Sequence, residues 1–119
     1  MESYPLPSTR FFQVSADVKL AYSVIPASTR VAAPRAPIVL IVGWTGTKED
    51  WYSLPTVLAS CGHDVLVYDH RGFGESSEHV KADGKYTLEL LADDAAALSR
   101  HVFTKQKIHL MGISSQTRE

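Results

Sequence analysis

The stretch GHDVLVYDHRGFGESS (62–77) decides the fold of this chain. Its first half, HDVLVYD, has an apolar centre that is typical of a strand covered on both faces. Its second half carries Gly72 and Gly74, which let the backbone fold tightly where a side chain would collide. The polar side chains of Asp69 and Arg71 would stabilise this turn through polar contacts. We interpret these four residues as a structural turn beside a buried strand rather than as catalytic groups.

Two other apolar runs resemble this strand, and a third segment does not. PIVLIV (37–42) and KIHLM (107–111) have the composition of strands that are buried on both faces. FFQVSADVKLAYSVI (11–25) instead alternates apolar with polar or small residues around a Ser-Ala-Asp turn, which predicts an antiparallel hairpin. The segment 26–37, rich in Pro, Ala and Ser, is predicted to be a surface connection.

Helices are predicted between the apolar strands. Asp50 can cap a helix over roughly 51–61. Gly62 follows this helix at the position where a residue in the left-handed backbone conformation commonly ends a helix. Thr87 can cap a second helix, whose apolar residues fall on one stripe. The residues of that stripe are Leu88, Leu91, Ala92, Ala95, Leu98 and Val102.

The order strand, helix, strand, helix, strand implies right-handed crossovers. We therefore predict an α/β fold: an N-terminal β-hairpin followed by a mostly parallel βαβαβ sheet with helices on both faces. The 119 residues suffice for one domain, in which residues 1–10 are expected to be a flexible N-terminus.

The composition excludes several function classes. The net charge is −1, and 45% of the residues are hydrophobic, so nothing indicates a nucleic-acid partner or a membrane-attracted surface. The longest aliphatic run, 38–42, is too short for a transmembrane segment. A single cysteine, Cys61, and an N-terminus that does not resemble a signal peptide favour a cytoplasmic location.

Ligands of open parallel sheets bind at the carboxyl ends of the strands, and the loop after 107–111 carries a candidate nucleophile. Gly112-Ile113-Ser114 is the first half of a Gly-x-Ser-x-Gly elbow, in which a strained strand-to-helix turn raises the serine hydroxyl. By spacing, Ser114 is the nucleophile candidate, and the backbone N–H of Ser115 would contribute to an oxyanion hole. The alternative is an ordinary loop serine, and 112–119 would then be only a tail.

The loop after 37–42 offers a second oxyanion donor. The backbone N–H of Trp44 stands where acyl-transfer enzymes of this architecture place one, although Trp44 also suits a loop aromatic that covers the sheet end. The GTK at 46–48 lacks the remaining residues of a phosphate-binding loop.

Four further histidines are not spaced like metal ligands, and they are predicted to be surface or packing residues. These are His63, His79, His101 and His109. Asp93 and Asp94 are predicted to be solvated or structural.

Four stretches of the chain, taken in their order, resemble the N-terminal half of the α/β-hydrolase superfamily, serine-nucleophile type. They are IVLIVGWTGTKEDW, GHDVLVYDHRGFGESS, TLELLADDAAALSRHV and IHLMGIS. The resemblance implies that Ser114 is the nucleophile, that Trp44 and Ser115 supply the oxyanion-hole N–H groups, and that Gly112 belongs to the elbow. It implies carboxylic ester, thioester, amide or lipid acyl substrates, which react through an acyl-enzyme. No metal or organic cofactor is implied.

Three departures from that family pattern shape the functional hypotheses. Val42 replaces a histidine that many members carry, and Gln116 replaces the second small residue of the elbow. No histidine follows Ser114, and Glu119 is the only acid after it. His70 is the upstream alternative for the missing base, provided that it comes within hydrogen-bond reach of Ser114.

Two functions remain open. The chain is a truncated serine hydrolase that is inactive alone because it lacks the acid and the histidine of the triad. Alternatively, it is a non-catalytic binding or regulatory fragment that pairs with a full-length hydrolase or another partner. Strand 107–111 would form an open sheet edge, which also predicts possible self-association.

Overall fold

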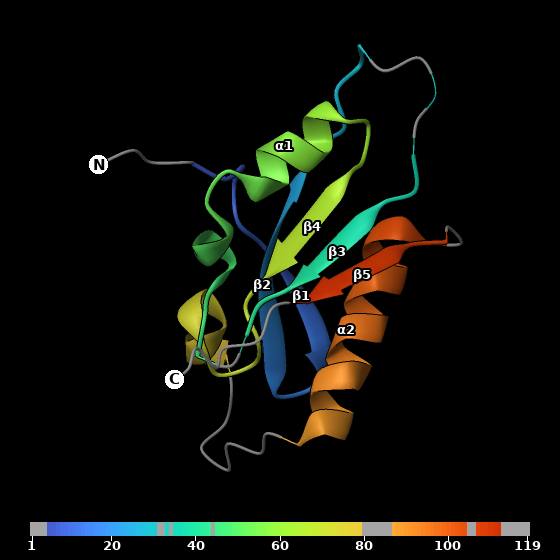
Figure 1. The fold of residues 1–119 in the computed structure, drawn as a ribbon. Coiled ribbons are helices and arrows are strands. Elements are labelled where there is room, and N and C mark those ends of the chain that lie inside the picture. The colour runs from blue at the N-terminus through green and yellow to red at the C-terminus, as the bar shows by residue number, and fades with distance from the viewer. Residues whose placement is uncertain are drawn as a thin grey trace, which may run out of the picture.

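The computed structural model of the protein describes residues 5–30, 33, 35–43, 45–79, 87–104 and 107–112, and it contains one five-stranded sheet (Figure 1). The strand order is β1-β2-β4-β3-β5. The strands are β1 (Arg10–Ser15), β2 (Val18–Ile25), β3 (Ile38–Ile41), β4 (Val65–Tyr68) and β5 (His109–Gly112). The helices are α1 (Leu54–Ser60) and α2 (Leu88–Phe103), with short 3-10 turns η1 (Lys48–Trp51) and η2 (Gly74–His79).

The predicted fold class is confirmed. Strands β1 and β2 form an antiparallel hairpin, and β2 pairs antiparallel with β4. Strand β3 then pairs parallel with β4 on one side and with β5 on the other. Since β3 and β4 lie inside the sheet, their side chains are covered on both faces, which explains their apolar runs.

The two helices cover opposite faces of the sheet, as predicted. Alternate residues of β3 and β4 point to opposite sides. Val39 and Leu66 join a core cluster with Leu98 of α2, whereas Leu40 and Val67 join a second cluster with residues of α1. The central strands therefore have a hydrophobic core on each side.

The helix expected over 51–61 begins later than predicted. Helix α1 starts at Leu54, with Pro55 in its first turn, where a missing N–H costs nothing. Asp50 does not cap this helix: its carboxylate accepts a hydrogen bond from the backbone nitrogen of Thr47, 2.9 Å away, and so closes the preceding turn η1. Gly62, with φ of 102°, follows the helix as the expected left-handed residue.

Helix α2 is capped as predicted, but its buried stripe differs. The Thr87 side chain accepts a hydrogen bond from the backbone nitrogen of Leu90. Ala95 and Leu98 are buried, whereas Leu88 is 83% exposed and Ala92 is also exposed. The buried residues of α2 therefore begin only at Asp94, nearly two turns after the start of the helix.

Strand β5 has the apolar composition of a strand buried on both faces, but it forms the open sheet edge that was expected of 107–111. It lies at the edge of the described sheet, and all four of its residues are exposed. Leu110 is 63% exposed and Met111 is 38% exposed. Within the described residues, none of the helices is long and apolar enough to cross a membrane.

Candidate functional site at the carboxyl end of the sheet

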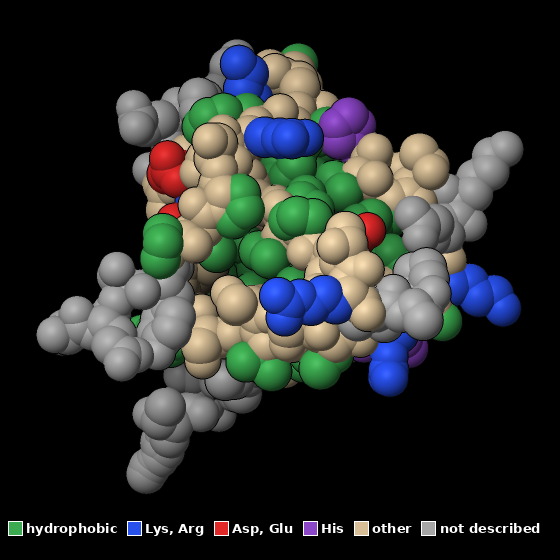
Figure 2. All heavy atoms as spheres, turned by 90° about the horizontal axis from the view of Figure 1, so that it is seen from above, with side chains coloured by type: hydrophobic (Ala, Val, Ile, Leu, Met, Phe, Trp, Pro, Cys, Tyr) green, Lys and Arg blue, Asp and Glu red, His purple; other side chains and the backbone are tan. Residues whose placement is uncertain are grey.

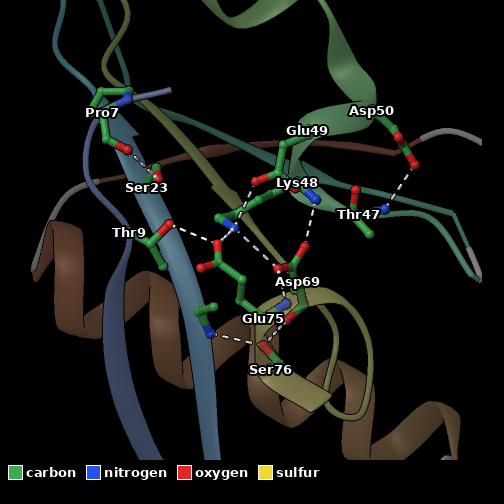
Figure 3. A network of polar contacts seen from close by, with 11 residues as sticks. Pro7, Thr9, Ser23, Thr47, Lys48, Glu49, Asp50, Asp69, Glu75 and Ser76 are labelled. Carbon is green, nitrogen blue, oxygen red and sulfur yellow. Dashed lines mark hydrogen bonds and ion pairs between the residues drawn. The ribbon is translucent and has the colours of Figure 1, made fainter. Parts of the chain in front are cut away.

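The loops that leave β3 and β4 meet at the carboxyl ends of these parallel strands. The loop after β3 contains η1, and the turn after β4 contains η2. Figure 3 shows their polar side chains converging around Asp69 and Lys48. Figure 2 shows the opposite end of the sheet, where hydrophobic side chains gather with lysine and arginine side chains around them. At the carboxyl end, the carboxylates of Glu49, Asp69 and Glu75 surround the Lys48 ammonium group.

Asp69 is the centre of this network. Its side chain is fully buried, and one carboxylate oxygen accepts a hydrogen bond from the backbone nitrogen of Lys48 at 2.6 Å. The other oxygen accepts one from the backbone nitrogen of Glu75 at 2.9 Å and faces the Lys48 ammonium nitrogen at 3.3 Å. A buried carboxylate is stable only with such partners. Asp69 thus joins the loop after β3 to the turn after β4.

Residue 74 must be a glycine because the carboxylate of Asp69 lies directly beside its backbone. It has φ of 51°, and a Cβ built on it would lie 2.5 Å from a carboxylate oxygen of Asp69. Gly72, at φ of 82°, also adopts the left-handed region that favours glycine. The turn therefore packs its backbone directly against the aspartate that fixes it.

Arg71 ties the same turn to α2. Its guanidinium group donates two hydrogen bonds of 2.7 Å to the two carboxylate oxygens of Asp94. Asp94 is buried, so this bidentate pair is shielded from solvent. The sequence pattern gave no partner for Asp94, although an acid between buried helix positions is a signal that one is needed.

Lys48 is the main site residue that the sequence analysis did not identify. Its side chain is fully buried, and its ammonium group forms ion pairs with Glu49, Asp69 and Glu75. Burial lowers the pKa of Lys48, but the hydrogen bonds to Glu75 and Glu49 and the charge of Asp69 outweigh it, so the pKa is raised overall. No local pattern predicts contacts that span 21 and 27 residues of sequence.

The network continues to the hairpin. The Ser76 hydroxyl donates to the backbone oxygen of Asp69 at 3.0 Å and accepts from the backbone nitrogen of Ala21 at 2.9 Å. Glu75 accepts a hydrogen bond of 2.9 Å from the hydroxyl of Thr9. Hydrogen bonds from Lys48 and then Thr9 lower the pKa of Glu75. Three separate segments are therefore joined at one corner of the sheet.

The loop after β3 is itself tightly wound. The backbone nitrogen of Gly46 donates to the oxygen of Gly43 at 2.9 Å, and a Cβ on Gly46 would lie 2.6 Å from the Val42 side chain. Thr45 has φ of 72°, a strained value for a β-branched residue. Strain of this kind is common in loops that carry function, and it persists only where neighbouring contacts hold the backbone.

His70 is buried beside this loop. Its Nε2 lies 2.7 Å from the backbone oxygen of Val42, so this nitrogen carries the proton and donates it. Its Nδ1 has no hydrogen-bond partner among the described residues. In this arrangement His70 serves as a link between the ends of β3 and β4.

The remaining predicted site residues divide into two groups. Trp44, Ser114 and Ser115 lie outside the residues that the structure describes. Gly112 ends β5 and pairs with Ile41, and a Cβ there would meet the backbone oxygen of Ile41 at 3.6 Å, an ordinary contact. Where side chains are described, no group of three His, Cys, Asp or Glu residues is arranged to hold a metal ion.

Known proteins share this fold. A family model for the alpha/beta hydrolase fold matches residues 36–115. Proline iminopeptidase of Thermoplasma volcanium is 34% identical over 80 residues, which cover 67% of this chain and 26% of that protein. Rhodomycin D methylesterase of Streptomyces sp. (strain C5) is 35% identical over 80 residues, covering 66% of this chain and 26% of that protein.

A solved hydrolase from Pseudomonas aeruginosa superposes with a TM-score of 0.71 and 28% identity, over 89% of this chain and 36% of that one. The chain thus spans only about a quarter to a third of the length of the proteins it matches. The family match nevertheless extends over both parallel crossovers and over the loops that follow β3 and β4. On this evidence the chain belongs to the α/β-hydrolase fold family.

Proposed function

We propose that this chain is the N-terminal part of a serine hydrolase that acts on carboxylic ester, thioester, amide or lipid acyl substrates. In this proposal the Ser114 hydroxyl attacks the acyl carbonyl, and the backbone N–H groups of Trp44 and Ser115 stabilise the resulting oxyanion. Collapse of the tetrahedral intermediate expels the leaving group and forms an acyl-enzyme. Water then hydrolyses the acyl-enzyme and frees the serine.

One observation carries this proposal: the family match extends to residue 115 and so includes the candidate nucleophile. The strand register supports it. Gly112 pairs with Ile41 in parallel strands, so the chain leaves β5 and β3 at the same edge of the sheet. The names of two relatives, an iminopeptidase and a methylesterase, also favour hydrolysis of acyl bonds.

The Ser114 hydroxyl needs a base to accept its proton, and the sequence bears on where that base comes from. No histidine follows Ser114 in the 119 residues, whereas family members carry the acid and the histidine after the serine. The upstream candidate, His70, already donates its Nε2 proton to the backbone oxygen of Val42, just after β3. We therefore propose that the acid and the histidine come from polypeptide outside these 119 residues and that this chain is inactive alone.

A fluorophosphonate probe tests the proposal, because it labels only an activated serine. We expect no labelling of the 119-residue chain. A fusion of residues 1–115 to the C-terminal part of the related methylesterase should be labelled, and Ser114→Ala should abolish that labelling. Labelling of the 119-residue chain that is lost in Ser114→Ala would show that the truncation account is wrong. A folded fusion that is not labelled would count against Ser114 as the nucleophile.

The exposed edge favours a second candidate function, in which the chain is a non-catalytic fragment that pairs with a partner or with itself. Beside β5, a cleft of about 420 Å³ lies between α2 and the sheet, lined by apolar residues that include Ile41, Ala96 and Leu110. An open strand edge next to apolar surface is a typical site of strand pairing.

Sedimentation of the purified chain separates the two candidates. Self-association that is reduced by Leu110→Lys, but not by Leu88→Lys on the exposed start of α2, would support pairing through β5. A monomer at all concentrations that does not co-purify with a full-length hydrolase would argue against the second candidate.

A further inference from the structure

Lys48 is unusual because its whole side chain is buried while its charge is retained. The ammonium group contacts carboxylates from three places in the sequence: Glu49 in its own turn, Asp69 at the end of β4, and Glu75 in η2. A buried lysine that lacked such partners would lose its proton or be expelled to the surface. The site is therefore built around a cation at this position.

The backbone of Lys48 is held by the same partner as its side chain. Its nitrogen donates to one oxygen of Asp69 at 2.6 Å, and its ammonium group faces the other oxygen at 3.3 Å. Asp69 in turn receives the backbone N–H of Glu75, and Gly74 leaves room for this contact. Lys48 and Asp69 thus form a double connection between two loops that share no strand pairing (Figure 3).

The loop that Lys48 holds is short and strained. It runs from Gly43 to Asp50 and contains Thr45 in the left-handed region. Such a backbone keeps its conformation only if it is fixed at both ends. Strand β3 fixes its start, and Lys48 lies where its other end meets the turn after β4.

We propose that Lys48 is a positioning residue: its buried ammonium group holds the loop after β3 against the turn after β4 and sets the direction of the N–H groups in that loop. The consequence for catalysis rests on the proposed function, in which this loop carries an oxyanion donor. The positioning itself does not depend on any reaction.

Amide hydrogen exchange in the full ¹⁵N-labelled chain tests this inference. The informative amides are those of residues 48 and 75, both bound to Asp69, and that of Val67 in the centre of the sheet. Lys48→Met removes the charge but keeps the length of the side chain. We expect exchange at residues 48 and 75 to accelerate about tenfold or more, with exchange at Val67 unchanged, because opening is local. Lys48→Arg should restore most of the protection, and Lys19→Met on the exposed face of β2 is the matched control.

Two results would overturn the inference. Unchanged exchange at residues 48 and 75 in Lys48→Met would mean that the lysine holds nothing in place. Equal acceleration at residue 67 would mean that it stabilises the whole sheet rather than the loop. Should Lys48→Met not fold, the double variant Lys48→Met/Asp69→Asn removes both charges, and wild-type protection at residue 75 in that variant would contradict the proposal. Because no substrate is involved, these results stand apart from the outcome of the fluorophosphonate experiment.

Discussion

One carboxylate oxygen of Asp69 lies 2.6 Å from the backbone nitrogen of Lys48, and the other lies 3.3 Å from the ammonium nitrogen of the same residue. Two contacts between one pair of residues fix both distance and orientation. Because both side chains are fully buried, neither contact is weakened by water. The pair therefore controls how the loops after β3 and β4 face each other.

Replacing the central carboxylate should be costly. Asp69→Asn removes the charge that receives Lys48 and the Glu75 amide, so we expect the free energy of unfolding to fall by about 2 to 3 kcal/mol. Urea denaturation followed by the fluorescence of buried Trp51 measures this change. Asp93→Asn, at an exposed position on α2, is the control and should change stability by less than about 0.5 kcal/mol. Equal effects of the two substitutions would contradict the central role of Asp69.

The glycines of the site should differ in their tolerance of a methyl group. Gly74→Ala places a Cβ about 2.5 Å from the Asp69 carboxylate at a positive φ, so we expect a loss of about 2 kcal/mol or more. Gly112→Ala meets only an ordinary contact at 3.6 Å and should cost less than about 1 kcal/mol. Thermal melting of both variants checks the comparison, and a Gly74→Ala protein as stable as Gly112→Ala would show that the turn can relax.

The Glu75–Lys48 ion pair predicts how stability depends on pH. The pKa of Glu75 is lowered from 4.5 by the hydrogen bonds from Lys48 and Thr9, so its stabilising contribution is present above that value. The contribution is lost as the pH falls through the lowered pKa in the folded state. The pKa of Lys48 is raised above 10.5, so its contribution is present below that value and is lost as the pH rises through the raised pKa.

Glu75→Gln should therefore lower the urea midpoint at pH 7 but have a much smaller effect in strongly acidic buffer, where wild-type Glu75 is also neutral. Asp69 and Glu49 contact the same ammonium group and remain in this variant. A difference between Glu75→Gln and wild type that stays constant from neutral to strongly acidic pH would mean that the charge of Glu75 does not contribute.

The Tyr68 hydroxyl is buried and has no hydrogen-bond partner in the described part of the chain. Burial and then the charge of Asp94 raise the pKa of Tyr68, so the phenol stays neutral. Tyr68→Phe removes an unsatisfied polar atom and should raise the free energy of unfolding by about 1 kcal/mol. Tyr52→Phe, at a residue that is 69% exposed, should have almost no effect. A loss of stability in Tyr68→Phe would indicate that the hydroxyl has a partner after all.

The fold could be predicted from the sequence because its signals are local. The apolar runs of β3 and β4 and the alternation in the hairpin reflect burial on two faces or one, and Thr87 marks the start of α2 by its own side chain. The start of α1 was misplaced because Asp50 can serve the turn η1 as well as a helix. Local chemistry allowed both readings, and only the tertiary structure separates them.

The site was predicted only in part because its contacts are distant in sequence. Asp69 and Gly74 were identified as a turn, and they lie side by side. The partners of the turn, Lys48 and Asp94, come from a different loop and from α2, and nothing near them in the sequence pairs them with it. For β5, the apolar composition is typical of burial on both faces, and the strand nevertheless lies at the edge of the described sheet, as expected if its next partner strand is missing.

The position of β3 between β4 and β5 has a consequence for how the chain acquires its structure during synthesis. Strand β3 leaves the ribosome long before β5, which pairs with it from roughly 70 residues further along the chain. Until then one side of β3 has no neighbour, so the nascent chain passes through a stage in which its most apolar strand is half paired. Chaperone binding during translation should therefore be concentrated on that interval.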